Sequence, residues 1–174
     1  MTKKATSVPA QESTSEMTSS KQLGFLEDFM HVTGTCQADM ARALGLTRGG
    51  ISHAFRSDDM KISMCYKFVD SLGYDLEFKL EKEDFKYVSD SVTVRITMKE
   101  EPIDDPSSNV YLRFLSTALL RYHISKKDLA ETLQITYNTV RHWFMVDDIY
   151  ISHIYRIARL FDLSLRIAIK PKKA

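Results

Sequence analysis

The sequence predicts a mainly α protein with a small β-sheet, built as two similar lobes in one chain. The first observation is an internal repeat: residues 25–80 align with residues 114–169 without a gap, at a constant offset of 89, with 14 identities in 56 pairs. Apolar residues recur at helical spacing through most of each repeat, and each repeat ends in a segment where apolar and polar residues alternate. The first pattern is typical of amphipathic helices and the second of a strand.

The composition bounds the class of protein. The chain has 174 residues, of which 44% are hydrophobic, so both lobes can bury a core. No apolar run approaches the roughly 20 residues that a membrane helix needs, and no apolar stretch near the N-terminus indicates a secretory signal. Cys36 and Cys65 form no pattern. We therefore expect a cytoplasmic protein without a membrane partner.

The net charge of +1 hides an asymmetry between the lobes. Residues 24–84 carry 7 Lys and Arg against 11 Asp and Glu, a net charge of −4, whereas residues 109–174 carry 11 against 5, a net charge of +6. If the partner is a polyanion, we expect the second lobe to attract it more strongly.

Four segments follow from these patterns. Residues 1–20 are rich in small polar and charged residues and are predicted to be a disordered tail. The first lobe covers 21–84 and the second covers 109–174. Between them, residues 85–108 are predicted to contain a strand at 91–98 and then a proline-containing acidic linker.

Each lobe is predicted to contain four helices and a terminal strand. In the first lobe the helices cover 21–32, 36–44, 48–56 and 64–72, and the strand covers 74–80. Gly45 ends the second helix, Thr47 caps the third, Ser63 caps the fourth, and Gly73 ends the fourth. The pair Asp58-Asp59 is interpreted as a turn rather than a metal site.

The second lobe repeats this order, with Ser125 as the cap of its second helix. Its helices are predicted near 109–122, 126–133, 137–144 and 153–161, followed by a strand at 163–169. We expect the strand 91–98 to be the hairpin partner of the strand 74–80, and the strands 74–80, 91–98 and 163–169 to form one sheet that joins the lobes.

Residues 37–55 carry the pattern that predicts function. Ala41 stands four residues before Gly45, as two steeply crossing helices with a tight turn require. Apolar residues at 40, 44, 46, 51 and 54 are expected to fill the seam between these helices. In the second lobe Gln134 replaces the glycine, which raises the free energy of a left-handed turn by about 1 kcal/mol.

This helix-turn-helix pattern resembles the repressor/Cro-like (XRE-type) family. The resemblance covers residues 22–73 and 111–162. It implies two tandem lambda-repressor-like helix-turn-helix lobes, each ending in a β-strand, that form a pseudo-dimer. In the family, the second helix of the motif lies in the major groove and reads base edges, and the first helix contacts phosphate.

By position, the resemblance implies two sets of DNA-contacting residues. Those implied to read bases are Arg48, Gly49, Ser52, His53, Tyr137, Asn138, Arg141 and His142. Those implied to contact phosphate are Gln37, Thr47, Arg56, Lys126, Lys127 and Thr136. Arginine suits the edge of guanine and asparagine that of adenine. Because the two base-reading sets differ, we expect the two half-sites to differ.

We therefore expect a sequence-specific double-stranded DNA-binding protein, a transcriptional regulator with two recognition helices in successive major grooves. The alternative is a protein-interaction module, such as an antitoxin or a recombination accessory factor, with secondary or no DNA binding. A protein partner or further self-association is compatible with both. The sequence contains no nucleophile–base pair, phosphate loop, cofactor fingerprint or zinc spacing, so we expect no enzyme, no cofactor and no metal.

Overall fold

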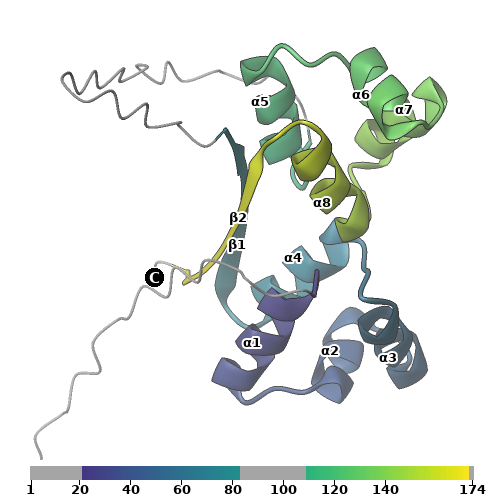
Figure 1. The fold of residues 1–174 in the computed structure, drawn as a ribbon. Helices are drawn as coiled ribbons and strands as arrows, with labels where there is room; N and C mark the ends of the chain where they lie inside the picture. The colour runs from purple at the N-terminus through teal and green to yellow at the C-terminus, as the bar shows by residue number, and fades with distance from the viewer. Residues whose placement is uncertain (1–20, 83–108, 173–174) are drawn as a thin grey trace, which may run out of the picture.

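The computed structural model describes residues 21–82 and 109–172, which form a mainly helical fold with one two-stranded antiparallel sheet. The elements of the first lobe are α1 (Gly24–Thr33), α2 (Gln37–Leu44), α3 (Arg48–Ser57), α4 (Ile62–Ser71) and β1 (Tyr74–Glu81). Those of the second lobe are α5 (Arg113–Arg121), α6 (Lys126–Leu133), α7 (Tyr137–Val146), α8 (Ile151–Leu160) and β2 (Ser164–Pro171). The predicted order of helices and strand is therefore present in both lobes (Figure 1).

The two lobes are joined through the sheet. Strand β1 pairs with β2 from Tyr74 opposite Pro171 to Glu81 opposite Ser164. Phe78 faces Ile167, and these two residues are separated by the repeat offset of 89, so the pairing is centred on equivalent positions. The expectation that 74–80 and 163–169 belong to one sheet is confirmed, and the two strands pair directly. The predicted tail at 1–20, the predicted strand at 91–98 and the linker lie outside the described residues.

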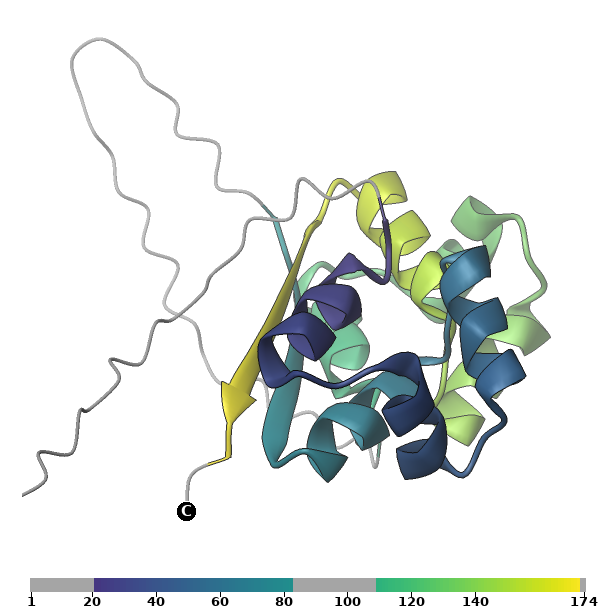
Figure 2. The ribbon, with the colours of Figure 1, turned by 90° about the horizontal axis from the view of Figure 1, so that it is seen from below.

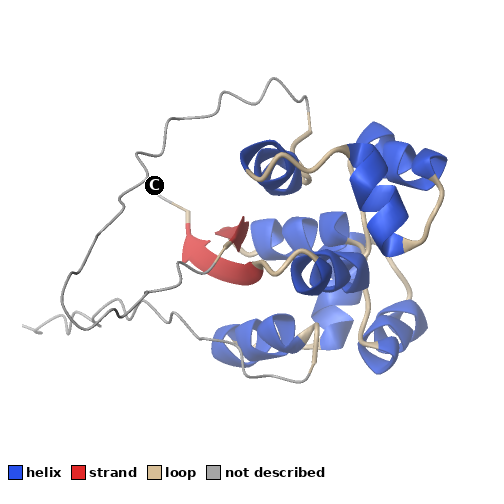
Figure 3. Ribbon diagram, turned by 45° about the horizontal axis from the view of Figure 1, so that its top comes forward, coloured by secondary structure: helices blue, strands red, loops and turns tan. Residues whose placement is uncertain are grey.

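The sheet lies along one side of the molecule (Figure 3). The pairs α2–α3 and α6–α7 both lie on the side away from the sheet, one pair in each lobe, and two perpendicular views agree on this arrangement (Figures 1 and 2). Helices α4 and α8 lie between the sheet and these pairs (Figure 1).

A single core runs through both lobes. Buried residues of the first lobe, such as Leu26 and Phe68, belong to the same apolar cluster as Leu115 and Ile154 of the second. The ring of Phe78 links them, because its centroid lies 5.9 Å from that of Phe25 and 5.4 Å from that of Phe114. The lobes therefore share buried surface and do not fold around separate cores.

A second junction lies at the start of α4 and α8. The backbone N–H of Ile62 donates to the carbonyl of Ile149 at 2.8 Å, and the N–H of Ile151 donates to that of Met60 at 2.9 Å. Each bond is the copy of the other at an offset of 89. Between them Lys61 and Tyr150 form an isolated antiparallel bridge, with Lys61 Nζ 6.0 Å from the centroid of the Tyr150 ring.

Each lobe also caps a helix of the other lobe. The Asp148 carboxylate accepts from the N–H of Ser63 at 3.1 Å and from its hydroxyl at 2.8 Å. Reciprocally, the Asp59 carboxylate accepts from the N–H of Ser152 at 3.0 Å and from its hydroxyl at 2.8 Å. The prediction that Ser63 caps the fourth helix is therefore wrong: α4 begins at Ile62, and the capping carboxylate comes from the second lobe.

The first aspartate of each pair acts within its own lobe. Asp58 has a left-handed backbone with φ 52° at the end of α3, and its carboxylate accepts from the N–H groups of Gln22 and Leu23 at 2.7 and 2.9 Å. Asp147 has the same φ of 52° and accepts from the residues that precede α5. The interpretation of these aspartates as turn residues is confirmed, and each also holds the start of a helix.

The remaining differences from the predicted elements are small. Helix α8 begins at Ile151, two residues before its predicted start, and α5 begins at Arg113, four residues after it. Met40 and Ile51 are buried in the seam as expected, whereas Leu46 is 44% exposed. Leu46 lies in the turn itself, where its N–H bonds to the carbonyl of Ala41, so its side chain faces away from the seam. None of the helices in the described ranges is long and apolar enough to cross a membrane.

Candidate nucleic-acid interface

The turn between the two helices of each pair has the same backbone in both lobes. Gly45 adopts φ 64°, and Gln134, its counterpart, adopts φ 55°. After each residue, the next N–H returns to the end of the first helix: Leu46 donates to Ala41 at 2.8 Å and Ile135 to Ala130 at 3.0 Å. The left-handed turn predicted at both positions is therefore present, although one copy lacks the favoured glycine.

Small side chains allow the two helices of each pair to approach closely. Ala41 and Ala130 are only 4% and 3% exposed. In the second lobe, Leu129 and Val140 fill the seam on either side of Ala130 and are fully buried. The position of the second helix on the first is thus set by packing, which leaves the other face of α3 and α7 to solvent.

Threonine fixes the start of each second helix. The hydroxyl oxygen of Thr47 accepts from the N–H of Gly50 at 3.1 Å, and that of Thr136 accepts from the N–H of Thr139 at 3.2 Å. Thr47 therefore caps α3 as predicted. The resemblance also implies that both threonines contact phosphate. A phosphate bound there would lie beside hydroxyl groups that already cap the helix.

The residues implied to read bases lie on the first turns of α3 and α7. Arg48, Gly49 and His53 are exposed on α3, and Ser52 is half-buried. On α7 all four counterparts are exposed: Tyr137, Asn138, Arg141 and His142. Residues spaced at i, i+1, i+4 and i+5 share one helix face. The structure therefore brings each set together on a solvent-facing surface.

The residues implied to contact phosphate are more varied. Gln37 is half-buried at the first position of α2, and Arg56 is exposed in the last turn of α3. Lys126 Nζ lies 4.3 Å from the centroid of the Phe144 ring, and Lys127 Nζ lies 3.8 Å from a Glu131 carboxylate oxygen. Both lysines are exposed, so these weak contacts orient the ammonium groups without burying them.

A carboxylate already occupies the N-terminus of each first helix. Asp39 accepts from the N–H of Cys36 at 2.9 Å, and Asp128 accepts from the N–H of Ser125 at 2.9 Å. Hydrogen bonds from the Cys36 and Ser125 side chains are the main cause that lowers the pKa of these two carboxyl groups. The negative charges complement the helix dipoles, so any phosphate contact at α2 or α6 must come from side chains.

The charge asymmetry of the lobes is not located on these helix pairs. Residues 37–57 carry three arginines and one aspartate, a net charge of +2. Residues 126–146 carry two lysines and one arginine against one aspartate and one glutamate, a net charge of +1. The two surfaces are therefore similarly basic, and the charge of a whole lobe does not rank them.

Much of the asymmetry lies where the lobes meet. Arg166 pairs with Glu81 at 3.4 Å, Lys170 pairs with Glu77 at 3.6 Å, and Lys172 pairs with Asp70. In each pair the cation comes from the second lobe and the anion from the first. These side chains are largely exposed, so each pair contributes little stability, but together they make the two lobes electrostatically complementary.

One feature of the second lobe has no signal in the sequence. The imidazole of His153 packs against the buried indole of Trp143, with centroids 4.8 Å apart and ring planes tilted by 37°. Burial is the main cause that lowers the His153 pKa below its ordinary value of 6.5. The counterparts in the first lobe are Met64 and Ala54, so this pair belongs to the second lobe alone.

Two further findings concern metal binding and similarity to known proteins. No group of three or more His, Cys, Asp or Glu residues that would suit a metal ion occurs in the described part of the chain. Comparison with protein-family models finds no match for this chain, and comparisons with curated proteins and with solved structures find none either.

Proposed function

We propose that this chain is a sequence-specific double-stranded DNA-binding protein that regulates transcription. In this proposal α2–α3 and α6–α7 are tandem helix-turn-helix motifs of the repressor/Cro-like kind, related as in a pseudo-dimer. The observation that carries it is the placement of two similar, exposed, basic helix pairs on the side away from the sheet (Figure 2).

The junction between the lobes supports the proposal that the chain binds two DNA half-sites at once. The reciprocal bonds at Ile62 and Ile151 and the paired strands hold α3 and α7 in one fixed relation. When two such helices enter successive major grooves on one face of B-DNA, the half-site centres lie about 34 Å, or about 10 base pairs, apart. A rigid two-lobed chain therefore suits a site of defined spacing.

The side chains support unlike half-sites. Arg48 on α3 and Arg141 on α7 can each donate two hydrogen bonds to guanine, and Asn138 can pair with adenine. They do not occupy equivalent positions, since Arg48 corresponds to Tyr137 and Arg141 corresponds to Ser52. The proposed operator is thus two different half-sites.

A binding-site selection from a random duplex library tests this proposal. We expect one enriched motif with two unlike halves, and an affinity that falls as salt rises, with a log–log slope of about −0.9 for each phosphate neutralised. Arg141→Ala should relax the preference in one half only, and Arg48→Ala in the other. A library that yields no enriched motif with the wild-type chain would remove DNA reading as the function.

One observation favours the second candidate, a protein-interaction module with secondary or no DNA binding. The end of α7 exposes Met145 and Val146, which are 71% and 48% exposed. Their counterparts in the first lobe are Arg56 and Ser57. Val110, 68% exposed, lies nearby because its N–H donates to Asp147. Co-purified protein bound through this patch, without DNA enrichment, would favour this candidate.

A further inference from the structure

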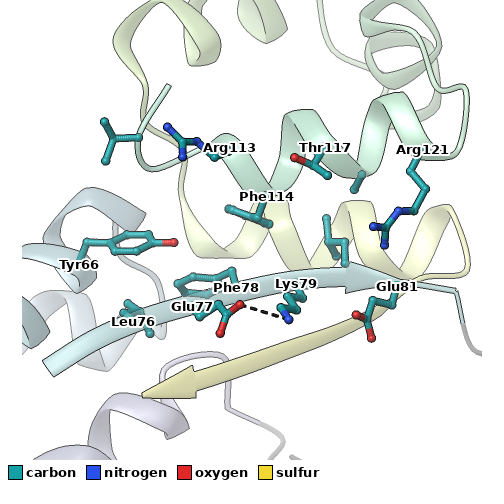
Figure 4. A pocket seen from close by; sticks show the side chains of 13 residues that line it. Tyr66, Leu76, Glu77, Phe78, Lys79, Glu81, Arg113, Phe114, Thr117 and Arg121 are labelled. Carbon is teal, nitrogen blue, oxygen red and sulfur yellow. Dashed lines mark ion pairs between the residues drawn. The ribbon is translucent and has the colours of Figure 1, made fainter. Parts of the chain in front are cut away.

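A groove of about 430 Å³ lies between α5 and β1, where the second lobe meets the first (Figure 4). Six consecutive residues of β1, from Leu76 to Glu81, line it. A sheet face would present alternate residues, so consecutive lining residues mean that the groove follows the edge of the strand. Within the described ranges no strand pairs with this edge of β1, since the sheet has only two strands.

The acidic side chains that line the groove have ion-pair partners, whereas its two arginines have none among the described residues. Glu77 and Glu81, on the strand, are paired with lysine and arginine side chains of β1 and β2. Arg113 and Arg121, on α5, have no ion-pair partner among the described residues, and both are exposed. Figure 4 shows both arginines above the strand, with Thr117 between them and Phe114 beside Phe78. The open positive charge therefore lies on the helix side.

The spacing of these arginines defines what fits. They are eight residues apart on a helix, which separates them by about 12 Å. In an extended peptide, side chains four residues apart lie on one face and are separated by about 13 Å. The residue midway between them shares that face and would meet Thr117 and the Phe114 ring. An added strand thus matches the groove if its first and fifth residues are acidic and its third residue is apolar, with any residue at the second and fourth positions.

We propose that this groove binds an extended acidic segment of a partner protein by strand addition to β1. Its backbone pairs with the edge of β1 that no strand of the described residues covers, its two carboxylates pair with Arg113 and Arg121, and its central apolar side chain packs between them. The groove is on the side of the sheet, away from α3 and α7, so this inference does not depend on DNA binding (Figure 1).

The test uses the full chain and two fluorescein-labelled, end-blocked peptides of identical composition. The probe is Thr-Glu-Thr-Val-Thr-Glu-Thr, and the control, Thr-Glu-Thr-Val-Glu-Thr-Thr, has its acids on opposite faces. Fluorescence anisotropy should show that the probe binds at least about tenfold more tightly than the control, since a charge-assisted bond is lost in the control. Equal binding of the two peptides would overturn the proposal.

Variants identify the contact. Arg113→Gln and Arg121→Gln should each weaken the probe by about tenfold, since each removes one charge-assisted bond. Arg159→Gln, which changes an exposed arginine of α8 outside the groove, is the matched control and should leave binding unchanged. If neither Arg113→Gln nor Arg121→Gln changes the affinity for the probe, the proposal is also overturned.

The chain's own sequence contains the same pattern at Glu101, Ile103 and Asp105. The double variant Glu101→Gln, Asp105→Asn separates the two occupants. If the wild-type chain rejects the probe but this variant accepts it, the groove serves the chain's own segment and the partner is excluded. If both accept it with arginine dependence, the partner proposal stands.

Discussion

Gln134 shows how one residue can hold a backbone shape that its chemistry disfavours. Its φ of 55° matches the 64° of Gly45, its counterpart in the first lobe. The glycine has open space where a Cβ would lie, so nothing but backbone conformation favours glycine there. The surrounding seam, anchored by the buried residues Ala130 and Val140, supplies the energy that keeps Gln134 left-handed.

Opposite substitutions at these two positions should therefore have opposite effects. Gln134→Gly should raise the free energy of unfolding by about 0.5–1 kcal/mol, and Gly45→Ala should lower it by about 1 kcal/mol, because each changes only the strain of the turn. Urea unfolding of both variants measures this. A fall in stability for Gln134→Gly would mean that the glutamine side chain contributes more than the strain costs.

His153 should make the second lobe sensitive to mild acid. Because its pKa in the folded protein is lowered, the unfolded chain binds the proton first as pH falls below 6.5. The free energy of unfolding should therefore decrease between about pH 7.5 and about pH 5.5, the range in which an ordinary histidine titrates. The indole of Trp143, which is the sole tryptophan, reports unfolding by its fluorescence.

The matched variant for this prediction is His153→Gln, which keeps a polar side chain but cannot be protonated in this range. It should lose less stability than the wild type over the same pH interval. An identical pH dependence in the two proteins would assign the effect to other groups.

At the scale of elements, the reciprocal caps tie the start of each inner helix to the opposite lobe. Asp148 holds the start of α4, and Asp59 holds the start of α8, each with two hydrogen bonds of 2.8–3.1 Å to one serine. Asp148 also lies 3.8 Å from Lys61 Nζ. The N-termini of α4 and α8 are therefore fully capped only when the two lobes are docked.

Removing either carboxylate should destabilise the whole chain by a similar amount. Asp148→Ala and Asp59→Ala should each lower the free energy of unfolding by about 1–2 kcal/mol, the usual cost of a lost cap. Asp28→Ala, which changes an exposed aspartate of α1 outside both junctions, serves as the control. Thermal unfolding by circular dichroism should show one transition that shifts with either substitution. Separate transitions for the two lobes would contradict the shared core.

The sequence predicted the elements well because each depends on nearby residues. The spacing of apolar residues in α1–α4, the cap at Thr47 and the alternation in β1 are all local patterns. It misplaced the cap of α4 because the true partner, Asp148, is 85 residues away from Ser63. Leu46 was misplaced because a turn residue next to a left-handed position does not follow helical periodicity.

At the scale of the whole molecule, charge has two separate uses. The excess acid of the first lobe and the excess base of the second meet at the sheet, as in Arg166 with Glu81 and Lys170 with Glu77. The proposed DNA-facing pairs carry similar charges of +2 and +1. The sequence predicted this charge difference but not its location, because net charge contains no information about which faces meet.

This distinction changes what salt-dependent DNA binding should reveal. Lys126→Ala with Lys127→Ala, and Arg48→Ala with Arg56→Ala, should each flatten the log–log salt slope by up to about 2 units, because each removes two cations of the proposed surface. Lys170→Ala with Lys172→Ala removes as much charge near the sheet and should leave the slope unchanged. An equal change in all three would show that total charge, rather than this surface, governs DNA affinity.

The bridge between Lys61 and Tyr150 has a consequence for how such a chain can diversify. In an assembly of two identical halves, the residue at this position would face its own copy, so the junction would hold two ammonium groups or two phenols. Here an ammonium group lies 6.0 Å from an aromatic ring, an attraction that identical copies cannot form. Covalent duplication lets a single codon change alter one side of the junction, so each half of the molecule is free to acquire its own chemistry.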